Sequence, residues 1–430
     1  MPQLNTEGQR LRVPGKTEMA EKTPNGAAPR STSDDEHPLG PPQHGSLMQL
    51  FRILGFGIYF LGSCLFIHGA QLLGVPLYFI SKDWFYAYMA LTKQYFGLLV
   101  TTMTQWWSPT VVRISGDTSV AGQLHQQADG SLSVKFPDRL VLIANHQIYT
   151  DWLYLWWIAY TNQVPTHGHL YIILKESLKW VPIIGPAMQF YGFVFMARKW
   201  ASDQKRLHHR LQKLNSRHSG PMSGAQGGNQ LDPMWLMIFP EGTNLSANTR
   251  SQSAKFSAKS GIPDLKHQIL PRSTGLQFCL QELKNTVDYV YDCTIAYEGI
   301  PPGGYGQDIF TLRSAYFQGR PPKSVNMHWR RFAVKDMPIE DHDAMYKWVL
   351  DRWREKDELL EQFARTGKFP ASLDAVDIEG GPKDSFKTAY INTEVQPKSP
   401  FEFLQMFAPV AAVAMVGRVG VQIIDRVLGK

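Results

Sequence analysis

Cysteine and charge are both scarce in this 430-residue sequence. Its three cysteines (Cys64, Cys279 and Cys293) are too few and too scattered for a disulfide framework or a four-ligand zinc site, which fits a reducing, cytosol-facing compartment. Charged residues make up only 19% of the chain and apolar residues 43%, so most of it should fold. The mean hydropathy is slightly negative, which excludes a polytopic transporter but not one or two membrane segments.

Several signatures of catalytic chemistry are also missing. The sequence has no zinc-ligand or Walker spacing, no repeat period and no Gly-x-Ser-x-Gly nucleophile elbow. Neither Cys279 nor Cys293 stands beside a candidate base, and the neighbours of Cys293 are typical of a strand interior. We therefore expect no metal, no cofactor and no covalent nucleophile.

The N-terminal part changes character sharply along its length. Residues 1–46 are rich in Pro, Gly, Ser and Thr with almost no apolar run, which predicts a disordered tail rather than a signal peptide. Residues 53–80 contain no Asp, Glu, Lys or Arg, and this run exceeds the roughly 20 apolar residues that span a bilayer as a helix. Pro76 should end or kink that helix.

A second uncharged stretch, residues 94–112, is amphipathic and carries the pair Trp106-Trp107. We interpret residues 47–112 as a membrane-embedded helical hairpin. A buried hairpin of a soluble protein is the alternative, and spanning and re-entrant paths are both left open.

Residues 113–370 have the pattern of an α/β domain. Short apolar runs alternate with helical segments, which predicts a mixed central sheet flanked by helices. The expected strands are 139–145, 170–174, 190–196, 234–239, 289–297 and 328–332, and the expected helices are 152–160, 199–214 and 339–365. The remaining segments are predicted as a low-complexity insertion (215–233), a linker (371–400) and a C-terminal amphipathic or membrane helix (401–430).

The first group of residues suited to chemistry is Asn145-His146-Gln-Ile-Tyr-Thr-Asp151, directly after a predicted buried strand. Ligands of open α/β sheets gather at the carboxyl ends of strands, and neutral imidazole is the natural base near pH 7. Asp151 can accept the other ring N–H of His146 and stabilise the imidazolium. The plainer alternative is a loop histidine followed by an aspartate that caps a helix.

Two further groups follow predicted strands. Glu241, Gly242 and Thr243 come after the strand at 234–239; a simple β-turn is the alternative. Lys175 and Arg198 follow the strands at 170–174 and 190–196, where a guanidinium can bind phosphate bidentately; surface cations are the alternative. Residues 171–214 carry eight Lys and Arg against two acidic residues, which favours anionic headgroups or a phosphorylated substrate.

The order of these motifs resembles the glycerolipid acyltransferase family over roughly residues 51–370. Beside the groups above, the resemblance rests on Leu270-Pro-Arg-Ser-Thr-Gly275, Val290-Tyr-Asp-Cys-Thr294 and Trp353-Arg-Glu-Lys-Asp357. These motifs are most similar to the eukaryotic branch with lysophosphatidic acid, lysocardiolipin and lysophosphatidylinositol acyltransferases. One departure is Tyr291-Asp292-Cys293, which stands where bacterial members commonly have Val-Pro.

The resemblance implies an acyl-CoA-dependent O-acyltransferase that acylates the free hydroxyl of a lysophospholipid by direct attack. It implies that His146 is the general base and that Asp151 orients it. It also implies that Glu241, Gly242, Thr243 and Arg198 hold the acceptor's glycerophosphate, with Lys175 assisting.

The implied partners are the acyl-CoA donor, the lysophospholipid acceptor and membrane lipids, with no nucleic acid. The implied location is a membrane, and we expect the endoplasmic reticulum because no Arg-rich transit peptide precedes the membrane segment. Two alternatives are a non-catalytic lipid-binding or membrane-shaping protein of the same fold, and a hydrolase or transacylase. The second of these requires a Ser or Cys nucleophile that the sequence does not suggest.

Overall fold

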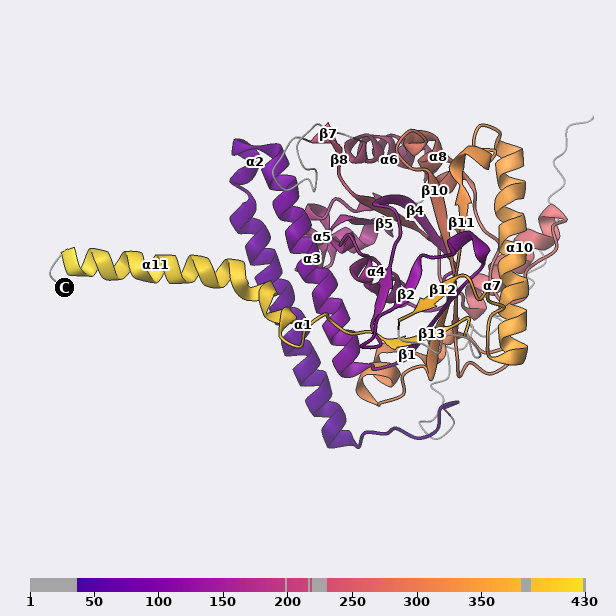
Figure 1. The fold of residues 1–430 in the computed structure, drawn as a ribbon, viewed down its shortest axis with the longest axis horizontal. Helices are drawn as coiled ribbons and strands as arrows, with labels where there is room; N and C mark the ends of the chain where they lie inside the picture. Colours follow the sequence, from indigo (N-terminus) through magenta and orange to yellow (C-terminus); the bar gives the residue numbers. More distant parts are fainter. Residues whose placement is uncertain (1–36, 198, 216, 219–229, 380–387, 428–430) are drawn as a thin grey trace, which may run out of the picture. The chain divides into compact units, whose positions relative to one another are not determined.

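The computed structural model describes residues 37–197, 199–215, 217–218, 230–379 and 388–427. The elements below belong to the unit formed by residues 42–430, whose centre is an eight-stranded mixed sheet in the order β13-β1-β11-β10-β4-β9-β5-β6 (Figure 1). Its strands are β1 (Val111–Gly116), β4 (Arg139–Ala144), β5 (Leu170–Lys175), β6 (Val194–Met196), β9 (Met234–Ile238), β10 (Tyr289–Tyr297), β11 (Ser324–Ala333) and β13 (Ile391–Glu394). This mixed sheet with flanking helices confirms the predicted α/β class.

The parallel strands β4, β9, β5 and β6 fix where the polar motifs meet. In the register of β4 and β9, Arg139 lies opposite Met234 and Ile143 opposite Ile238, so both strands end at the same edge. β5 pairs in parallel with β9 on one side and with β6 on the other. The loops that follow these strands therefore leave from one edge of the sheet, as expected for an α/β site.

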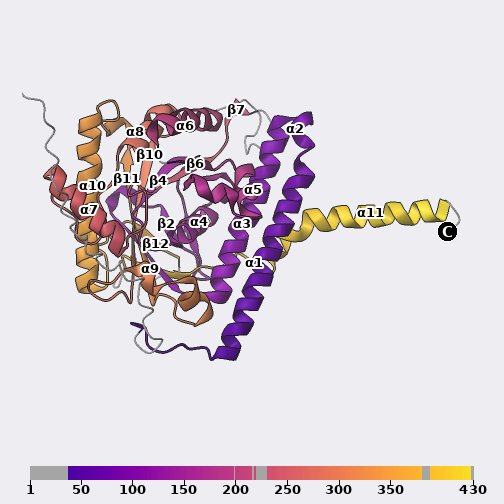
Figure 2. The ribbon, with the colours of Figure 1, turned by 180° about the vertical axis from the view of Figure 1, so that it is seen from behind.

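Helices cover the sheet on both sides (Figure 2). On one side α6 (Trp200–Leu214), α8 (Thr274–Leu283) and α10 (His342–Thr366) share an apolar core with β4, β9 and β10. On the other side α4 (Asp151–Thr161) packs against α3 (Lys82–Trp107), and α1 (Ser46–Gly74) packs on α3 in turn. The views place α1 and α3 along one flank, with α10 on the opposite side of the sheet.

One helical segment among the described residues, Ser46–Ile80, is long and apolar enough to cross a membrane. It is interrupted between α1 and α2 (Leu77–Ile80), with Pro76 as the residue before α2, which confirms the expected break. Only 22% of its most apolar window is buried inside the protein, so it is not an ordinary core helix.

Smaller elements complete the described part of the chain. The helices are α5 (Ile184–Phe190), α7 (Ala247–Ser260), α9 (Gly306–Ile309) and α11 (Ala408–Val427). The short strands are β2 (Leu124–Gln126), β3 (Leu132–Val134), β7 (Arg217–His218), β8 (Gln230–Leu231) and β12 (Val376–Ile378).

The structure differs from the sequence predictions in several places, and helices such as α7 and α8 were not expected at all. The strand expected at 190–196 is only Val194–Met196, because Phe190 ends α5. The segment 371–400 is more than a linker, since β12 pairs with β2 and β13 pairs with β1 at the edge of the main sheet. The uncharged stretch 94–112 ends as a helix at Trp107, and β1 begins at Val111.

Some predicted segments lie wholly or partly outside the described residues. Of the predicted tail 1–46 only residues 37–46 are described, and α1 begins at Ser46. Residues 219–229 of the insertion, 380–387 of the linker segment and 428–430 at the C-terminus lie outside the described part as well.

Candidate active site

His146 lies in the loop that leaves the carboxyl end of β4. The preceding residue, Asn145, is fully buried and anchors this loop to the neighbouring strand β10. Its side-chain amide donates to the carbonyl of Ile295 at 3.0 Å and accepts from the amide of the same residue at 2.8 Å. The backbone directly before His146 is therefore fixed to β10 by these two hydrogen bonds.

Asp151 is the first residue of α4, and its carboxylate turns back to His146. Oδ2 lies 2.8 Å from Nδ1 of His146 and also accepts the backbone N–H groups of Gln147 (2.7 Å) and Ile148 (3.1 Å). A carboxylate at a helix N-terminus is further favoured by the helix dipole. The alternative of a helix-capping aspartate is not what the structure has, because Thr150 is the N-cap of α4 and the two amides that Asp151 accepts belong to the loop before the helix.

The second oxygen of Asp151 accepts the hydroxyl of Tyr297 at 2.5 Å. Burial, followed by the negative charge of Asp151, raises the pKa of Tyr297 well above its ordinary value, so the phenol stays a donor. Asp151 thus has a hydrogen-bond donor on each oxygen and is fully buried. This arrangement fixes a charged carboxylate behind the imidazole.

The His146 ring is oriented on its face as well as at its edge. It stacks on Phe239 with ring centroids 4.4 Å apart and planes 25° apart. Its side chain is 19% exposed, while that of Asp151 is 0% exposed. With Nδ1 facing Asp151, no described residue hydrogen-bonds to Nε2, and this is the nitrogen that can meet a substrate.

The loop after β9 is bound directly to the histidine loop. The amide of Leu245 donates to the carbonyl of His146 at 2.8 Å, and Glu241 Oε1 accepts the amide of His146 at 3.2 Å. Gly242 adopts φ +72°, which favours glycine, and nothing lies within 4 Å of the position a Cβ would take. Gly242 is exposed and Thr243 half-buried, so the two face open space beside the histidine loop.

Glu241 does not have the environment that the resemblance implies. Its side chain is 3% exposed, and Oε1 also accepts from the indole N–H of Trp353 at 3.4 Å. Burial raises its pKa to about 8. Oε1 accepts from two of the protein's own donors, while Oε2 is buried and hydrogen-bonds to no described residue. These contacts fit a carboxyl that positions the His146 backbone.

Two family models match the chain: one described as "Acyltransferase" over residues 125–298 and one described as "Acyltransferase C-terminus" over residues 315–404. The 2-acyl-1-lysophosphatidylinositol acyltransferase of Saccharomyces cerevisiae is 40% identical over 65% of this chain and 75% of its own. An uncharacterized acyltransferase of Schizosaccharomyces pombe is 35% identical over 80% of this chain and 89% of its own. Lysocardiolipin acyltransferase 1 of Gallus gallus is 30% identical over 73% of this chain and 74% of its own.

The chain belongs to this acyltransferase family. The expected membership is thereby confirmed, and the enzyme is an acyltransferase. The second family model extends over α10 and β13.

Of the two basic residues predicted for the site, Lys175 lies at the same edge of the sheet as the histidine loop. Lys175 is the exposed last residue of β5, and β6 ends beside it at Met196. Arg198 lies outside the described residues. Asp203, which is buried, accepts the backbone amides of Ala197 and Lys199 at 2.9 Å each.

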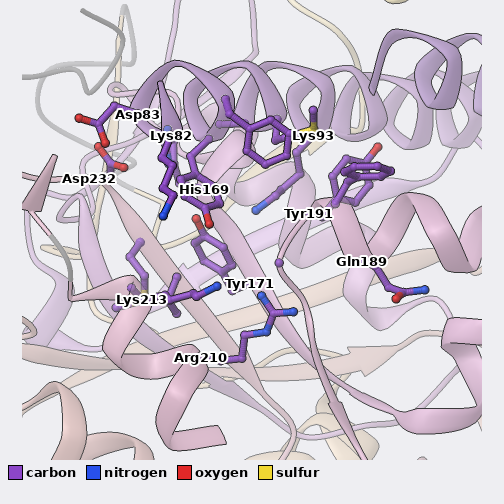
Figure 3. Close-up of a pocket in the computed structure, with 18 of the residues that line it drawn as sticks. Lys82, Asp83, Lys93, His169, Tyr171, Gln189, Tyr191, Arg210, Lys213 and Asp232 are labelled. Carbon is purple, nitrogen blue, oxygen red and sulfur yellow. The ribbon is translucent and has the colours of Figure 1, made fainter. Parts of the chain in front are cut away.

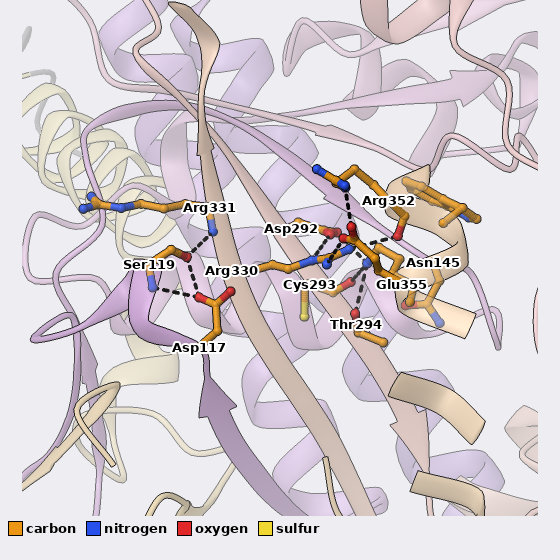
Figure 4. Close-up of polar contacts among 12 residues, drawn as sticks. Asp117, Ser119, Asn145, Asp292, Cys293, Thr294, Arg330, Arg331, Arg352 and Glu355 are labelled. Atoms are coloured by element: carbon orange, nitrogen blue, oxygen red, sulfur yellow. Dashed lines mark hydrogen bonds and ion pairs between the residues drawn. The ribbon is translucent and has the colours of Figure 1, made fainter. Parts of the chain in front are cut away.

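A buried ionic network stands behind the site and was not foreseen from the sequence (Figure 4). Asp292 of β10 pairs with Lys356 of α10 at 2.5 Å and with Arg330 of β11 at 2.7 Å. Lys356 Nζ also donates to the carbonyl of Cys293 at 2.6 Å, and Arg330 reaches Glu355 at 2.6 Å. The motif around Asp292 and the motif around Lys356 carried the family resemblance, and their function here is to join two strands and a helix.

Tyr297 is a further contributor that the sequence did not indicate, since only the fold brings its hydroxyl to Asp151. Asn145 and Trp353 lie in quoted motifs, but their contacts with Ile295 and Glu241 could not be foreseen. The three cysteines are all buried, and Cys293 lies inside β10 as expected. Within the described ranges, no group of three or more His, Cys, Asp and Glu side chains is arranged to hold a metal ion.

Proposed function

We propose that this acyltransferase moves a fatty acyl chain from acyl-CoA to the free hydroxyl of a lysophospholipid, with His146 as general base. The observation that carries the proposal is the His146–Asp151 pair, in which a buried carboxylate takes Nδ1 and leaves Nε2 for substrate. Neutral imidazole with a fixed tautomer is suited to accept a proton from a hydroxyl.

The reaction then proceeds in one balanced transfer. Nε2 of His146 takes the acceptor's hydroxyl proton as the oxygen attacks the thioester carbonyl. The carbon–sulfur bond breaks, the ester forms, and the imidazolium returns the proton to the departing CoA thiolate. Asp151 stabilises the imidazolium between these two steps.

Direct transfer is supported by the state of the cysteines. All three are buried, and burial raises the pKa of Cys279 to about 12. A buried neutral thiol is a poor nucleophile, so an acyl-cysteine intermediate has little support. This weakens the hydrolase and transacylase alternatives and favours attack by the acceptor itself.

The acceptor we propose first is lysophosphatidylinositol, with lysophosphatidic acid and lysocardiolipin as the other candidates. The yeast relative named as a lysophosphatidylinositol acyltransferase is 40% identical to this chain over 65% of its length, and the lysocardiolipin acyltransferase is 30% identical over 73%. The glycerophosphate would lie over Gly242 and Thr243, with Arg198 and Lys175 as its cations. Glu241 is left out of this set because its carboxyl is buried.

For membrane attachment we propose that α1 lies along the bilayer surface instead of crossing it. Near its start, Arg52 donates to the carbonyl of Tyr316 at 3.0 Å, and near its end Gln71 donates to that of Ala187 at 3.3 Å. These anchors are 19 residues apart, or about 28 Å along a helix, close to the thickness of the hydrocarbon core. A crossing α1 would therefore carry α5 and the turn at Arg313–Phe317 into the bilayer.

The exposed side of α1 has the composition this orientation needs. One face carries exposed apolar residues along its whole length: Leu47, Phe51, Leu54, Ile58, Leu61, Leu65 and Leu72. A continuous apolar stripe on a helix held against a folded domain is typical of interfacial attachment. We propose the endoplasmic reticulum as the membrane, which imaging of a tagged chain would test.

The experiment is an acceptor panel with purified protein in neutral detergent. Oleoyl-CoA is supplied with lysophosphatidylinositol, lysophosphatidic acid or lysocardiolipin, and the acylated product is measured by mass spectrometry. For every acceptor that is acylated, we expect product formation to depend on His146. The variant His146→Ala is therefore assayed in parallel, and its folding is checked by circular dichroism. Near wild-type turnover by folded His146→Ala would overturn the mechanism, and a preference for another acceptor would overturn only the headgroup assignment.

A further inference from the structure

A cavity of about 670 Å³ lies between α3, α5, α6 and the beginnings of β5 and β9. Its lining includes Lys82 and Lys93 of α3, Arg210 and Lys213 of α6, and Tyr171 of β5. Figure 3 shows the ends of these side chains pointing into the same space.

This cavity is separate from the proposed acyl-transfer centre. It is lined by Pro233 and Met234, where β9 begins, whereas Glu241 and the histidine loop follow the end of that strand. Five residues of β-strand separate Met234 from Phe239, which is about 16 Å. The cavity and His146 therefore lie at opposite edges of the sheet.

The charge of the cavity favours an anion. Four basic side chains line it, against the two acidic residues Asp83 and Asp232. Burial, and after it the nearby charges of Arg210 and Lys82, lower the pKa of Lys213, so these cations converge closely enough to repel one another. An anion placed among them would relieve that repulsion.

Lys93 is the most deeply placed of the four, with 2% of its surface exposed. Its Nζ donates to the carbonyl of Leu170 at 3.1 Å and lies 3.7 Å from the centroid of the Tyr171 ring. No carboxylate among the described residues forms an ion pair with it. Burial lowers the pKa of Lys93 well below its ordinary value, and an anionic ligand beside it would favour the charged form.

The rim of the cavity suggests where that ligand comes from. Tyr78 and Phe85, which line it, flank the junction of α2 and α3. The same junction exposes Phe79 (83%), Ile80 (79%) and Trp84 (49%). A basic interior beside an exposed apolar and aromatic rim matches a lipid whose headgroup is anionic and whose chains stay in the membrane.

We propose that this cavity binds the phosphate of an anionic membrane phospholipid, as a second lipid site beyond the acyl-transfer centre. The shared chemistry is a phosphate group among Lys82, Lys93, Arg210 and Lys213. Free phosphate carries the same group, so the test must separate the two sources.

The test uses native mass spectrometry of the full-length protein in a neutral detergent. Phosphatidylinositol, phosphatidylcholine and inorganic phosphate are each titrated into wild type and into the double variant Arg210→Gln/Lys213→Gln. Both substituted side chains lie on the solvent-accessible part of α6, so the fold should survive, which a melting curve checks. Lys205→Gln/Lys347→Gln removes two charges from exposed helix positions outside the cavity and serves as the matched control.

We expect wild type and the control to retain phosphatidylinositol over phosphatidylcholine, and the cavity variant to bind it about tenfold more weakly. Acyl transfer by the cavity variant should keep its kcat and its KM for acceptor. Unchanged phosphatidylinositol binding would overturn the proposal, and so would phosphate binding as tight as that of the lipid. A rise in acceptor KM in the cavity variant would show that the cavity is the acceptor site and would overturn a second lipid site. The activity of His146→Ala tests only the proposed acyl-transfer mechanism.

Discussion

The charge of Asp151 should be separable from its hydrogen bonds by the single change Asp151→Asn. All the groups that contact this side chain are donors: the His146 ring, two backbone amides and the Tyr297 hydroxyl. An asparagine can keep its carbonyl oxygen toward the first three and turn its NH₂ to Tyr297, whose hydroxyl can rotate and accept. The variant should therefore fold with His146 in place but without the negative charge.

The size of the expected effect follows from the geometry. The transition state converts imidazole to imidazolium beside a carboxylate that is fully buried and 2.8 Å away. Two unit charges with centres about 4 Å apart interact by about 4 kcal/mol at an effective dielectric constant of about 20. Losing that interaction corresponds to about a 10³-fold fall in kcat, within the range for general acid–base groups.

The assay is continuous detection of the CoA thiol with a thiol reagent, which the three buried cysteines should not disturb. His146→Ala, Asp151→Asn and the double variant complete a mutant cycle, with Asp117→Asn as a folded control for loss of one carboxylate elsewhere. Because Asp151 acts through His146, the double variant should be little worse than His146→Ala alone. A loss below about tenfold for Asp151→Asn, or a fully additive double variant, would refute the reasoning.

We expect three further outcomes for variants of Glu241, Lys356 and Arg198. Glu241→Gln should remove a pH dependence of the free energy of unfolding. Because burial raises the pKa of Glu241 to about 8, wild type should lose up to about 1.4 kcal/mol of this free energy per pH unit as the pH rises from 4.5 to 8. The same pH dependence in both proteins across that window would contradict this expectation. Lys356→Met should lower stability by about 3–5 kcal/mol by leaving Asp292 short of a buried partner; an unchanged melting temperature would argue against the ionic network. Arg198→Ala should raise the acceptor KM roughly 10- to 100-fold at saturating acyl-CoA, with Lys rescuing in part; a shift confined to the acyl-CoA titration would assign the arginine to the donor.

The elements that were predictable from sequence are those with strong local patterns. β4 and β9 were found because strands buried on both faces are continuous apolar runs, and β10 because it is rich in aromatic and β-branched residues although it contains Asp292. β13 was missed because Ile391–Glu394 is short, alternates buried and exposed residues, and pairs only at the sheet edge. Phe190, the last residue of α5, was assigned to the following strand because it opens an aromatic run that suits either structure.

The candidate site was likewise only partly predictable from the sequence. His146 and Asp151 are five residues apart, so their contact could be inferred from spacing alone. Tyr297 lies 146 residues from the aspartate it contacts, and Lys356 is brought to Asp292 by the packing of α10 on β10. The burial of Glu241 could not be predicted, because a motif does not show which way a carboxyl points. Its expected contact with the acceptor stays a prediction.

The proposed catalytic pair, His146 and Asp151, is connected to the proposed membrane face by direct packing instead of a flexible linker. Asp151 begins α4, and the next residue, Trp152, stacks on Phe96 of α3 with ring centroids 6.2 Å apart and planes 6° apart. Phe96 also contacts Trp156 one turn further along α4 at 5.3 Å. Because α3 in turn packs against α1, Trp152 and Trp156 link α4 to the helix that we propose lies on the lipid surface. These contacts, which lie close to Asp151 in sequence, would set the distance of His146 from that surface. An acceptor and a donor that both reside at that surface would then meet the imidazole at a fixed depth, which is what a one-step transfer between two lipids requires.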